Sequence, residues 1–205
     1  MTSAPAVKRA IAFVDGQNLF AAARDAFGLV TPCHRPALLA QRVAAREGWD
    51  LAEVRFYTGV PARQDDPRLH AWWTARLRRM RTEGVIVTAR PLRRRRKRAR
   101  LDDGRKVEFT VLQEKGIDVR IALDVVDAVL RGRCDVVLVF SQDQDFAELA
   151  EEVRVIAREQ RRWVKIASAY PVGPGTRNTR GIDRTDWIRI DRCLFESCTD
   201  EYGRS

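Results

Sequence analysis

The sequence predicts an α/β fold in which a mainly parallel sheet is flanked by helices. Short apolar runs typical of strands alternate along the chain with stretches of helical spacing. The run at residues 136–140 contains no polar residue, which is typical of a strand buried on both faces of a parallel sheet. Right-handed crossovers between such strands would bring all their C-terminal ends to one edge of the sheet.

The first half of the chain contributes three strands and three helices to this prediction. Gly28 is expected to end the first helix, and Pro36 is placed to begin the second at its first turn. Trp72 and Trp73 are adjacent in the third helix, so both cannot face the core and one is expected to be exposed. We expect strands at 10–14, 54–60 and 85–89 and helices at 17–27, 36–47 and 67–82.

The second half begins with a basic stretch that predicts an exposed hairpin at residues 93–111. The sequence Leu101-Asp102-Asp103-Gly104 is a turn signal, and the segment after it can form a returning strand. Asp124 and Asp127, further along the next helix, are expected to face solvent. The remaining elements are helices at 117–130 and 146–160, strands at 136–140 and 163–167, and a late edge strand at 187–190.

Length and composition indicate a single domain spanning residues 1–205. We expect its core at about 10–170, the hairpin insertion at about 91–111, and a C-terminal loop and edge strand at 171–205. Without a membrane-length apolar run or an apolar N-terminal segment, the protein is expected to be soluble and cytoplasmic, with no membrane partner. The four cysteines lack CxxC spacing and only two histidines are present, which argues against zinc and favours reduced thiols.

The net charge of +10 is concentrated in one segment. Residues 93–106 hold nine basic and two acidic residues and so supply +7 of it. A focused basic patch attracts polyanions, of which nucleic acid is the commonest, although a solvated charge run or an acidic protein partner would give the same pattern. The candidate nucleic-acid-binding residues are Arg93, Arg94, Arg95, Arg96, Lys97, Arg98, Arg100, Arg105 and Lys106, together with Lys115 beyond the hairpin.

Acidic residues follow both of the most apolar strands. Asp15 closes the first strand, and Asp143 follows the strand at 136–140 in the sequence SQDQD. Asp118 stands at the start of the helix at 117–130, whose N-terminus would face the same edge. If the two strands are neighbours, these carboxylates converge, repel one another and favour a bound cation. Since no sulfur or imidazole is at hand, Mg²⁺ or Mn²⁺ is the expected cofactor.

A structural interpretation competes for the later acids. Ser141 with Gln144, and Asp145 with Glu148, both fit the capping-box pattern at a helix N-terminus, where acids also interact well with the helix dipole. A metal held by several acids would instead suit hydrolysis of a phosphodiester, because the ion activates water and neutralises developing charge. Beside a basic hairpin, the substrate would be RNA or DNA.

Three ordered motifs resemble the signatures of the NYN domain family, which is related to the PIN-domain ribonucleases. They are VDGQN around Asp15, EKGIDV at residues 114–119 and SQDQDF at residues 141–146, and the resemblance covers about residues 11–169. It implies a PIN-like Rossmannoid fold, dependence on Mg²⁺ or Mn²⁺, and cleavage of RNA. Carried over by position, it assigns metal binding and catalysis to Asp15, Asp118, Asp143 and Asp145, with Asn18 shaping the site.

One feature departs from that family pattern. Gln142 and Gln144 stand where small residues are frequent, as in SGDSDF, and their bulk would narrow the site or contact substrate. The departure bears on turnover more than on the fold.

The leading hypothesis is a metal-dependent ribonuclease, more plausibly an endonuclease, for which DNA is a less favoured substrate. The alternative is a non-catalytic RNA-binding regulator or scaffold with the same fold, and the sequence leaves a homo-oligomer open. A phosphatase of the haloacid dehalogenase type needs a second Asp where Gln17 stands. P-loop and dinucleotide-binding enzymes are disfavoured because neither glycine motif follows a strand.

Overall fold

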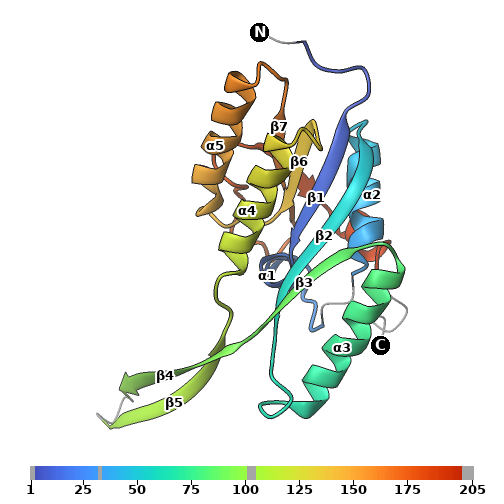
Figure 1. Ribbon diagram of the computed structural model, residues 1–205. Helices are drawn as coiled ribbons and strands as arrows, with labels where there is room; N and C mark the ends of the chain where they lie inside the picture. The colour runs from blue at the N-terminus through green and yellow to red at the C-terminus, as the bar shows by residue number, and fades with distance from the viewer. Residues whose placement is uncertain (1–2, 32–33, 101–104, 200–205) are drawn as a thin grey trace.

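The computed structural model describes residues 3–31, 34–100 and 105–199 and contains one main sheet of six strands. The strands are β1 (Arg9–Asp15), β2 (Asp50–Val60), β3 (Ile86–Pro91), β6 (Val136–Phe140), β7 (Lys165–Pro171) and β8 (Asp186–Ile190). Their order is β3-β2-β1-β6-β7-β8, and every neighbouring pair is parallel (Figure 1). The predicted α/β fold with a parallel sheet is confirmed.

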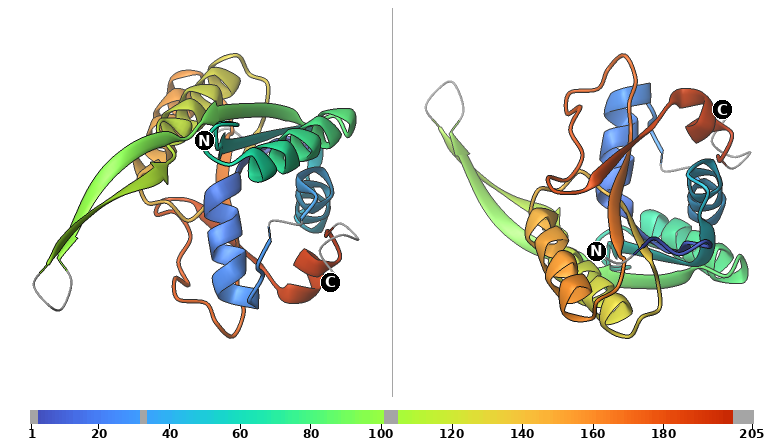
Figure 2. Two further views of the ribbon diagram at one scale, coloured as in Figure 1. Left: turned by 90° about the horizontal axis from the view of Figure 1, so that it is seen from below. Right: turned by 90° about the horizontal axis from the view of Figure 1, so that it is seen from above.

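Helices cover both faces of this sheet (Figure 2). Alternate side chains of β1 face opposite ways. Ile11 and Phe13 pack in the core shared with two helices, α4 (Ile117–Leu130) and α5 (Phe146–Glu159). Ala12 and Val14 pack in the second core, on the other face. That face is covered by α1 (Gly16–Phe27), α2 (Pro36–Arg46), α3 (Pro67–Thr82) and the short α6 (Arg192–Glu196).

The chain reverses its direction of winding between β1 and β6. From β1 it proceeds outward to β2 and β3, and it then returns to place β6 on the other side of β1. Such a switch point leaves a crevice at the C-terminal ends of the two central strands, and open α/β sheets bind their ligands there. The two strands whose ends carry Asp15 and the SQDQD segment are therefore direct neighbours.

A two-stranded antiparallel ribbon projects from the body at the C-terminal end of β3 (Figure 1). It consists of β4 (Arg93–Arg100) and β5 (Lys106–Gln113), and every side chain of β4 is exposed. The expected exposed hairpin is thus present, and the turn expected at residues 101–104 lies outside the described residues.

Asp124 contradicts the expectation that it faces solvent. It is buried where α4 crosses β2, and its carboxylate accepts a hydrogen bond of 2.8 Å from the Tyr57 hydroxyl. Arg120 donates two hydrogen bonds to it, of 3.1 and 2.5 Å, and Arg55 forms an ion pair at 3.6 Å. Burial of the charge is tolerated because it is paired on several sides. Asp127 remains partly exposed, in ion pairs with two arginines.

Smaller predictions have mixed outcomes. Trp72 is 40% exposed whereas Trp73 packs against the core, as expected for adjacent residues. Cys134, Cys193 and Cys198 are free thiols, and Cys33 lies outside the described residues. β7 begins two residues later than expected, and α6 was not predicted. Among the described helices, none is long and apolar enough to cross a membrane.

Candidate functional site

A cavity of about 340 Å³ opens beside the C-terminal ends of β1 and β6. Its lining contains four acids and two bases, contributed by β1, β4, the segment between β5 and α4, the start of α4 and the segment after β6. These are Asp15, Glu114, Asp118 and Asp143, with Arg95 and Lys115. The three acids that the sequence predicted to converge, Asp15, Asp118 and Asp143, thus line one cavity.

Asp15 is buried at the junction of β1 and α1. Its side chain is the N-cap of α1 and accepts a hydrogen bond of 3.0 Å from the backbone N–H of Asn18. The Ser141 hydroxyl donates to its other oxygen at 3.4 Å. Burial raises the pKa of the Asp15 carboxyl to about 6, and the negative charge of Asp143 adds to the rise. The side chain therefore caps α1, and its ionised form is disfavoured by burial and by Asp143.

The ends of β1 and β6 are joined by hydrogen bonds. The backbone N–H of Gln142 donates to the Asn18 side-chain oxygen at 2.9 Å, and the Asp143 N–H donates to the Ser141 hydroxyl at 3.2 Å. Asn18 therefore holds the turn after β6 against the start of α1. These bonds hold Asp143 close enough to Asp15 for their charges to interact.

The start of α4 depends on a glycine. Gly116 is the N-cap of α4 with φ of +78°, a left-handed conformation that residues with a Cβ rarely adopt. A Cβ there would also lie 2.7 Å from the Arg90 guanidinium. Because the helix can begin at this point, Asp118 falls in its first turn, exposed at the rim of the cavity.

Glu114 is a cavity acid that the sequence analysis quoted in a motif but did not assign. Its carboxylate accepts a hydrogen bond from the backbone N–H of Gly59, at the end of β2. Burial raises the pKa of Glu114 to about 7, and the charges of Asp15 and then Asp118 contribute. The sequence contained one sign of this role, the position of Glu114 four residues before Asp118, where the ribbon returns to the edge of the sheet.

Asp145 lies apart from the other predicted acids. It is exposed at the N-cap position of α5, where its side chain makes no capping hydrogen bond, and it is outside the cavity lining. Its backbone N–H donates to the Asp143 carboxylate at 3.1 Å. Asp145 thus contacts a cavity acid with its backbone N–H, and its side chain does not line the cavity.

Gln142 and Gln144 point away from the cavity and fasten a C-terminal loop. The Gln142 amide donates to the carbonyl oxygens of Asn178 and Arg180 at 2.7 and 2.8 Å. The Gln144 amide donates to the Gly181 carbonyl at 2.9 Å and accepts from the Asp183 N–H at 3.2 Å. Neither side chain lines the cavity. Both instead form hydrogen bonds to the loop that leads to β8.

Only two of the predicted basic residues, Arg95 and Lys115, reach the cavity. Because strand side chains alternate, Arg93 and Lys97 share the face of β4 that carries Arg95. On the other face, Arg94 donates to Asp65 at 2.6 Å and Arg98 pairs with Glu108 at 3.4 Å. The candidates outside the cavity lining are Arg93, Arg94, Arg96, Lys97, Arg98, Arg100, Arg105 and Lys106.

The cavity fits a hard divalent cation by its donor chemistry. Its acids offer only carboxylate oxygens. Burial, and to a lesser degree the neighbouring acids, raises the pKa of Asp15 and Glu114, and a bound cation would favour their ionised forms. Within the described residues, no three acidic, histidine or cysteine side chains are arranged closely enough to hold an ion by themselves. Mg²⁺ commonly binds through one or two carboxylates and completes its shell with water and substrate phosphate.

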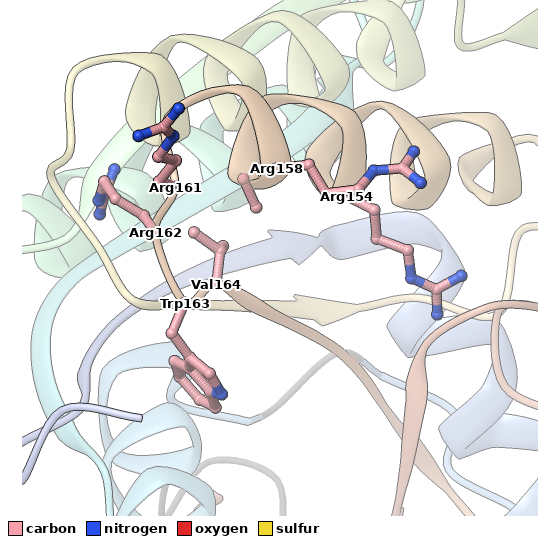
Figure 3. A pocket seen from close by; sticks show the side chains of 7 residues that line it. Arg154, Arg158, Arg161, Arg162, Trp163 and Val164 are labelled. Carbon is pink, nitrogen blue, oxygen red and sulfur yellow. The ribbon is translucent and has the colours of Figure 1, made fainter. Parts of the chain in front are cut away.

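A larger hollow of about 640 Å³ lies at the opposite edge of the sheet, between the end of α5 and the start of β7 (Figure 3). Arginines dominate it, but several are engaged with the protein itself. Arg162 donates to the Val129 and Cys134 carbonyls, and Arg158 pairs with Glu151. It contains no acid and no part of the three motifs, so the acidic cavity is the better candidate.

Most of the chain matches a known protein family. The model of the NYN domain family matches residues 9–178. A protein of unknown function from Vibrio parahaemolyticus RIMD 2210633 has a similar fold, with 20% identity, a TM-score of 0.56, and coverage of 95% of this chain and 99% of that chain. MurG from Acinetobacter baumannii aligns with 10% identity and a TM-score of 0.34 over 89% of this chain and 45% of that chain, too weakly to inform the fold.

No curated protein matches the chain. The matched family residues include the ends of β1 and β6, the basic ribbon and the start of α4. Because that match spans most of its length, the chain belongs to the NYN domain family.

Proposed function

We propose that this protein is a metal-dependent ribonuclease that hydrolyses phosphodiester bonds within an RNA chain. NYN domains are typically nucleases, which implies a nucleic-acid substrate, and PIN-like nucleases generally use divalent metals. The choice of RNA over DNA, internal cleavage and the cofactor Mg²⁺ or Mn²⁺ are parts of the proposal, as is action in the cytoplasm.

The observation that carries the proposal is the convergence of acids from distant parts of the sequence. Asp15, Asp118 and Asp143 line one cavity with Glu114, at the switch point of the sheet. Clustered acids whose pKa values are raised are common at functional sites. An acid with a purely structural role is usually paired with basic or hydrogen-bonding groups, as Asp124 is with Arg120 and Tyr57.

The chain's own residues divide the work of such a reaction. Asp15, Asp143 and Asp118 would hold the cation, with Glu114 as a fourth ligand or as a proton acceptor. The Asn18 backbone N–H and the Ser141 hydroxyl orient the Asp15 carboxylate, and the Asp145 backbone N–H donates to the Asp143 carboxylate. A divalent ion bound there supplies an activated water and neutralises charge on the phosphoryl group. Asp145 remains a predicted ligand.

Arg95 and Lys115 stand at the rim of the same cavity and would contact the RNA phosphates on either side of the cleaved bond. The exposed ribbon extends this positive surface away from the body (Figure 1). A polyanion guided along the ribbon would therefore reach the acids at its base.

The experiment is cleavage of an internally labelled single-stranded RNA, and of the matching DNA, by the purified protein with Mn²⁺ or Mg²⁺ and with chelator. Asp15→Asn and Asp143→Asn are each expected to reduce the cleavage rate by about 100-fold or more, a loss of the size that removed electrostatic stabilisation causes. Asp127→Asn is the matched control, because Asp127 is on α4 but outside the cavity. Undiminished cleavage by both cavity variants would rule out this site.

A second candidate function is a non-catalytic RNA-binding regulator with the same fold. It is favoured by one observation, that no three ligating side chains of the described residues are pre-arranged around a single point. In the same assay, tight binding of RNA that stays intact with Mn²⁺ would support it over the nuclease.

A further inference from the structure

An apolar pocket of about 620 Å³ lies next to the acidic cavity, between α1, α3 and the ends of β2 and β3. Aromatic side chains from two helices line it, Phe20 from α1 and Trp72 and Trp73 from α3. Val30 and Leu69, which are 85% and 42% exposed, add to the same lining. Exposed large apolar side chains that gather in one hollow usually mark a binding site.

Gly59 is the partition between this pocket and the acidic cavity. A Cβ at Gly59 would collide with Leu92, which lines the pocket, and would lie 2.8 Å from the Glu114 carboxylate, which lines the cavity. It would also approach the Gln17 side-chain amide to 3.2 Å. The two sites are therefore separated by the thickness of one backbone, and Gln17 stands at the border two residues after Asp15.

Trp72 is 40% exposed and lines the pocket, and its ring packs against two neighbouring side chains. The Arg76 guanidinium lies 5.4 Å from the centre of the ring, and Trp73 packs edge-on against it with ring centres 5.0 Å apart. A pre-ordered aromatic ring loses little conformational freedom when a flat ligand stacks on it.

We propose that this pocket receives an unpaired nucleobase of the RNA strand whose phosphate lies in the acidic cavity. The inference rests on the proposed function and adds the form of the substrate, a single strand with a splayed base. Aromatic side chains stack on any base, and the Gln17 amide at the border can hydrogen-bond to a base edge. A duplex keeps its bases stacked and paired and cannot enter.

The position of the pocket favours a base over an apolar segment of a protein partner. It adjoins, across Gly59, a cavity lined by Arg95 and Lys115, and Arg24 is part of the pocket's own lining. Positive charge beside an aromatic hollow is complementary to a nucleotide, which is anionic at the phosphate and flat at the base.

Binding of labelled RNA in chelator, measured by fluorescence anisotropy in an Asp15→Asn background so that no cleavage occurs, tests the proposal. Trp72→Ala is expected to weaken binding of intact single-stranded RNA about tenfold or more. Its affinity for a strand with abasic positions, and for duplex RNA, should match that of the background protein. Trp72→Phe should restore most of the loss, which a general defect in folding would not allow.

Trp187→Ala is the matched control, since Trp187 is 44% exposed on β8 and outside the pocket. Affinity for intact RNA that is unchanged by Trp72→Ala, or equal losses on intact and abasic strands, would overturn the inference. The first of these outcomes would point to a protein segment as occupant. If the protein never cleaves RNA but binds it in a Trp72-dependent manner, the nuclease proposal is wrong and the proposed base-binding pocket is still supported.

Discussion

The Asp15 side chain serves the fold and the candidate chemistry through different properties. As the N-cap of α1 it needs only an acceptor oxygen, which Asn supplies equally well. As a cavity acid it needs its charge, and burial beside Asp143 opposes that charge. Substitution by Asn therefore separates the two roles.

Asp15→Asn is expected to stabilise the metal-free protein at pH 8 by about 1–3 kcal/mol, since it removes a charge that burial and Asp143 disfavour. Urea or thermal unfolding in chelator measures the change. Asp127→Asn should shift stability in the opposite direction, because two arginines hold the pKa of Asp127 below its ordinary value. Equal destabilisation by both variants would mean that the Asp15 charge is not strained.

The metal-free protein should lose stability as pH rises from about 4 to about 7. The pKa of Asp15 rises from 3.8 to about 6 on folding, and that of Glu114 rises from 4.5 to about 7. In that window the folded state binds more protons than the unfolded state, so the free energy of unfolding falls with pH.

Melting temperatures across this pH range, with and without Mn²⁺, provide the measurement. Glu114→Gln should flatten the metal-free profile, and Mn²⁺ should reduce the loss at high pH because it binds the ionised acids. A metal-free profile that rises toward about pH 7 in the same way for Glu114→Gln would contradict the raised pKa values.

At this scale the sequence predicted Asp15, Asp118 and Asp143, because each follows an apolar strand or opens a helix at one edge. It did not assign Glu114, since that position depends on how the ribbon returns to the sheet. The contacts of Gln142 and Gln144 were also beyond prediction, because their partners lie more than 30 residues away in an irregular loop.

Among the elements, α4 is joined to β2 by a buried polar network. Tyr57, Arg55 and Arg120 all contact the Asp124 carboxylate, which is six residues along the helix from Asp118. Burial and the neighbouring Asp124 raise the pKa of the Tyr57 hydroxyl, which therefore stays a hydrogen-bond donor. The network fixes how α4 lies on the sheet and so where its first turn meets the cavity.

Asp124→Ala is expected to destabilise the protein by about 3–5 kcal/mol, since it leaves the buried Arg55 without one of its charge partners. Tyr57→Phe, which removes one neutral donor, should cost about 1–2 kcal/mol. Denaturant unfolding distinguishes the two. A loss below about 0.5 kcal/mol for Asp124→Ala, the size expected of surface sites, would mean that the network does not hold the helix.

The two faces of β4 provide a matched test of the ribbon. Arg93, Arg95 and Lys97 share the cavity face with Phe109 and Val111 of β5, whereas Arg94, Arg96 and Arg98 share the other face. Replacing either triplet by Ser removes the same charge from the same strand.

Loss of the cavity-face triplet should weaken RNA binding more than loss of the other triplet. It should also make the slope of log affinity against log salt concentration less steep, by up to about 2. The other triplet should have less effect, because Arg94 and Arg98 are already paired with acids. Binding measured over a range of salt concentrations provides both values. Identical slopes for the two variants would mean that the ribbon attracts RNA without orienting it.

The sequence predicted most elements because periodicity and turn residues are local signals. α3 and α4 have the expected bounds, and the hairpin follows from its basic run and turn signal. The five-residue α6 has too short a pattern to be seen, and Asp124 was misjudged because its partners come from β2, more than 60 residues away.

In the whole molecule, the switch point, the basic ribbon and the apolar pocket lie at one edge of the sheet. Figure 1 shows the ribbon projecting from that edge. The strand order that brings these features together could not be predicted from local sequence patterns. Apolar runs and their spacing predict a parallel sheet, but the adjacency of β1 and β6 depends on pairing between residues more than 100 positions apart, which no local pattern contains. With β1 and β6 adjacent, Asp15 and the segment that carries Asp143 lie at neighbouring strand ends.

Titration with Mn²⁺, followed by calorimetry, tests most directly whether these acids share one ion. Asp118→Asn and Asp143→Asn, from different elements, are each expected to lower the affinity of one and the same site about tenfold or more, while Asp127→Asn leaves it unchanged. Mn²⁺ binding that is indifferent to both cavity substitutions would contradict the account, because the acids would then not act together on a metal.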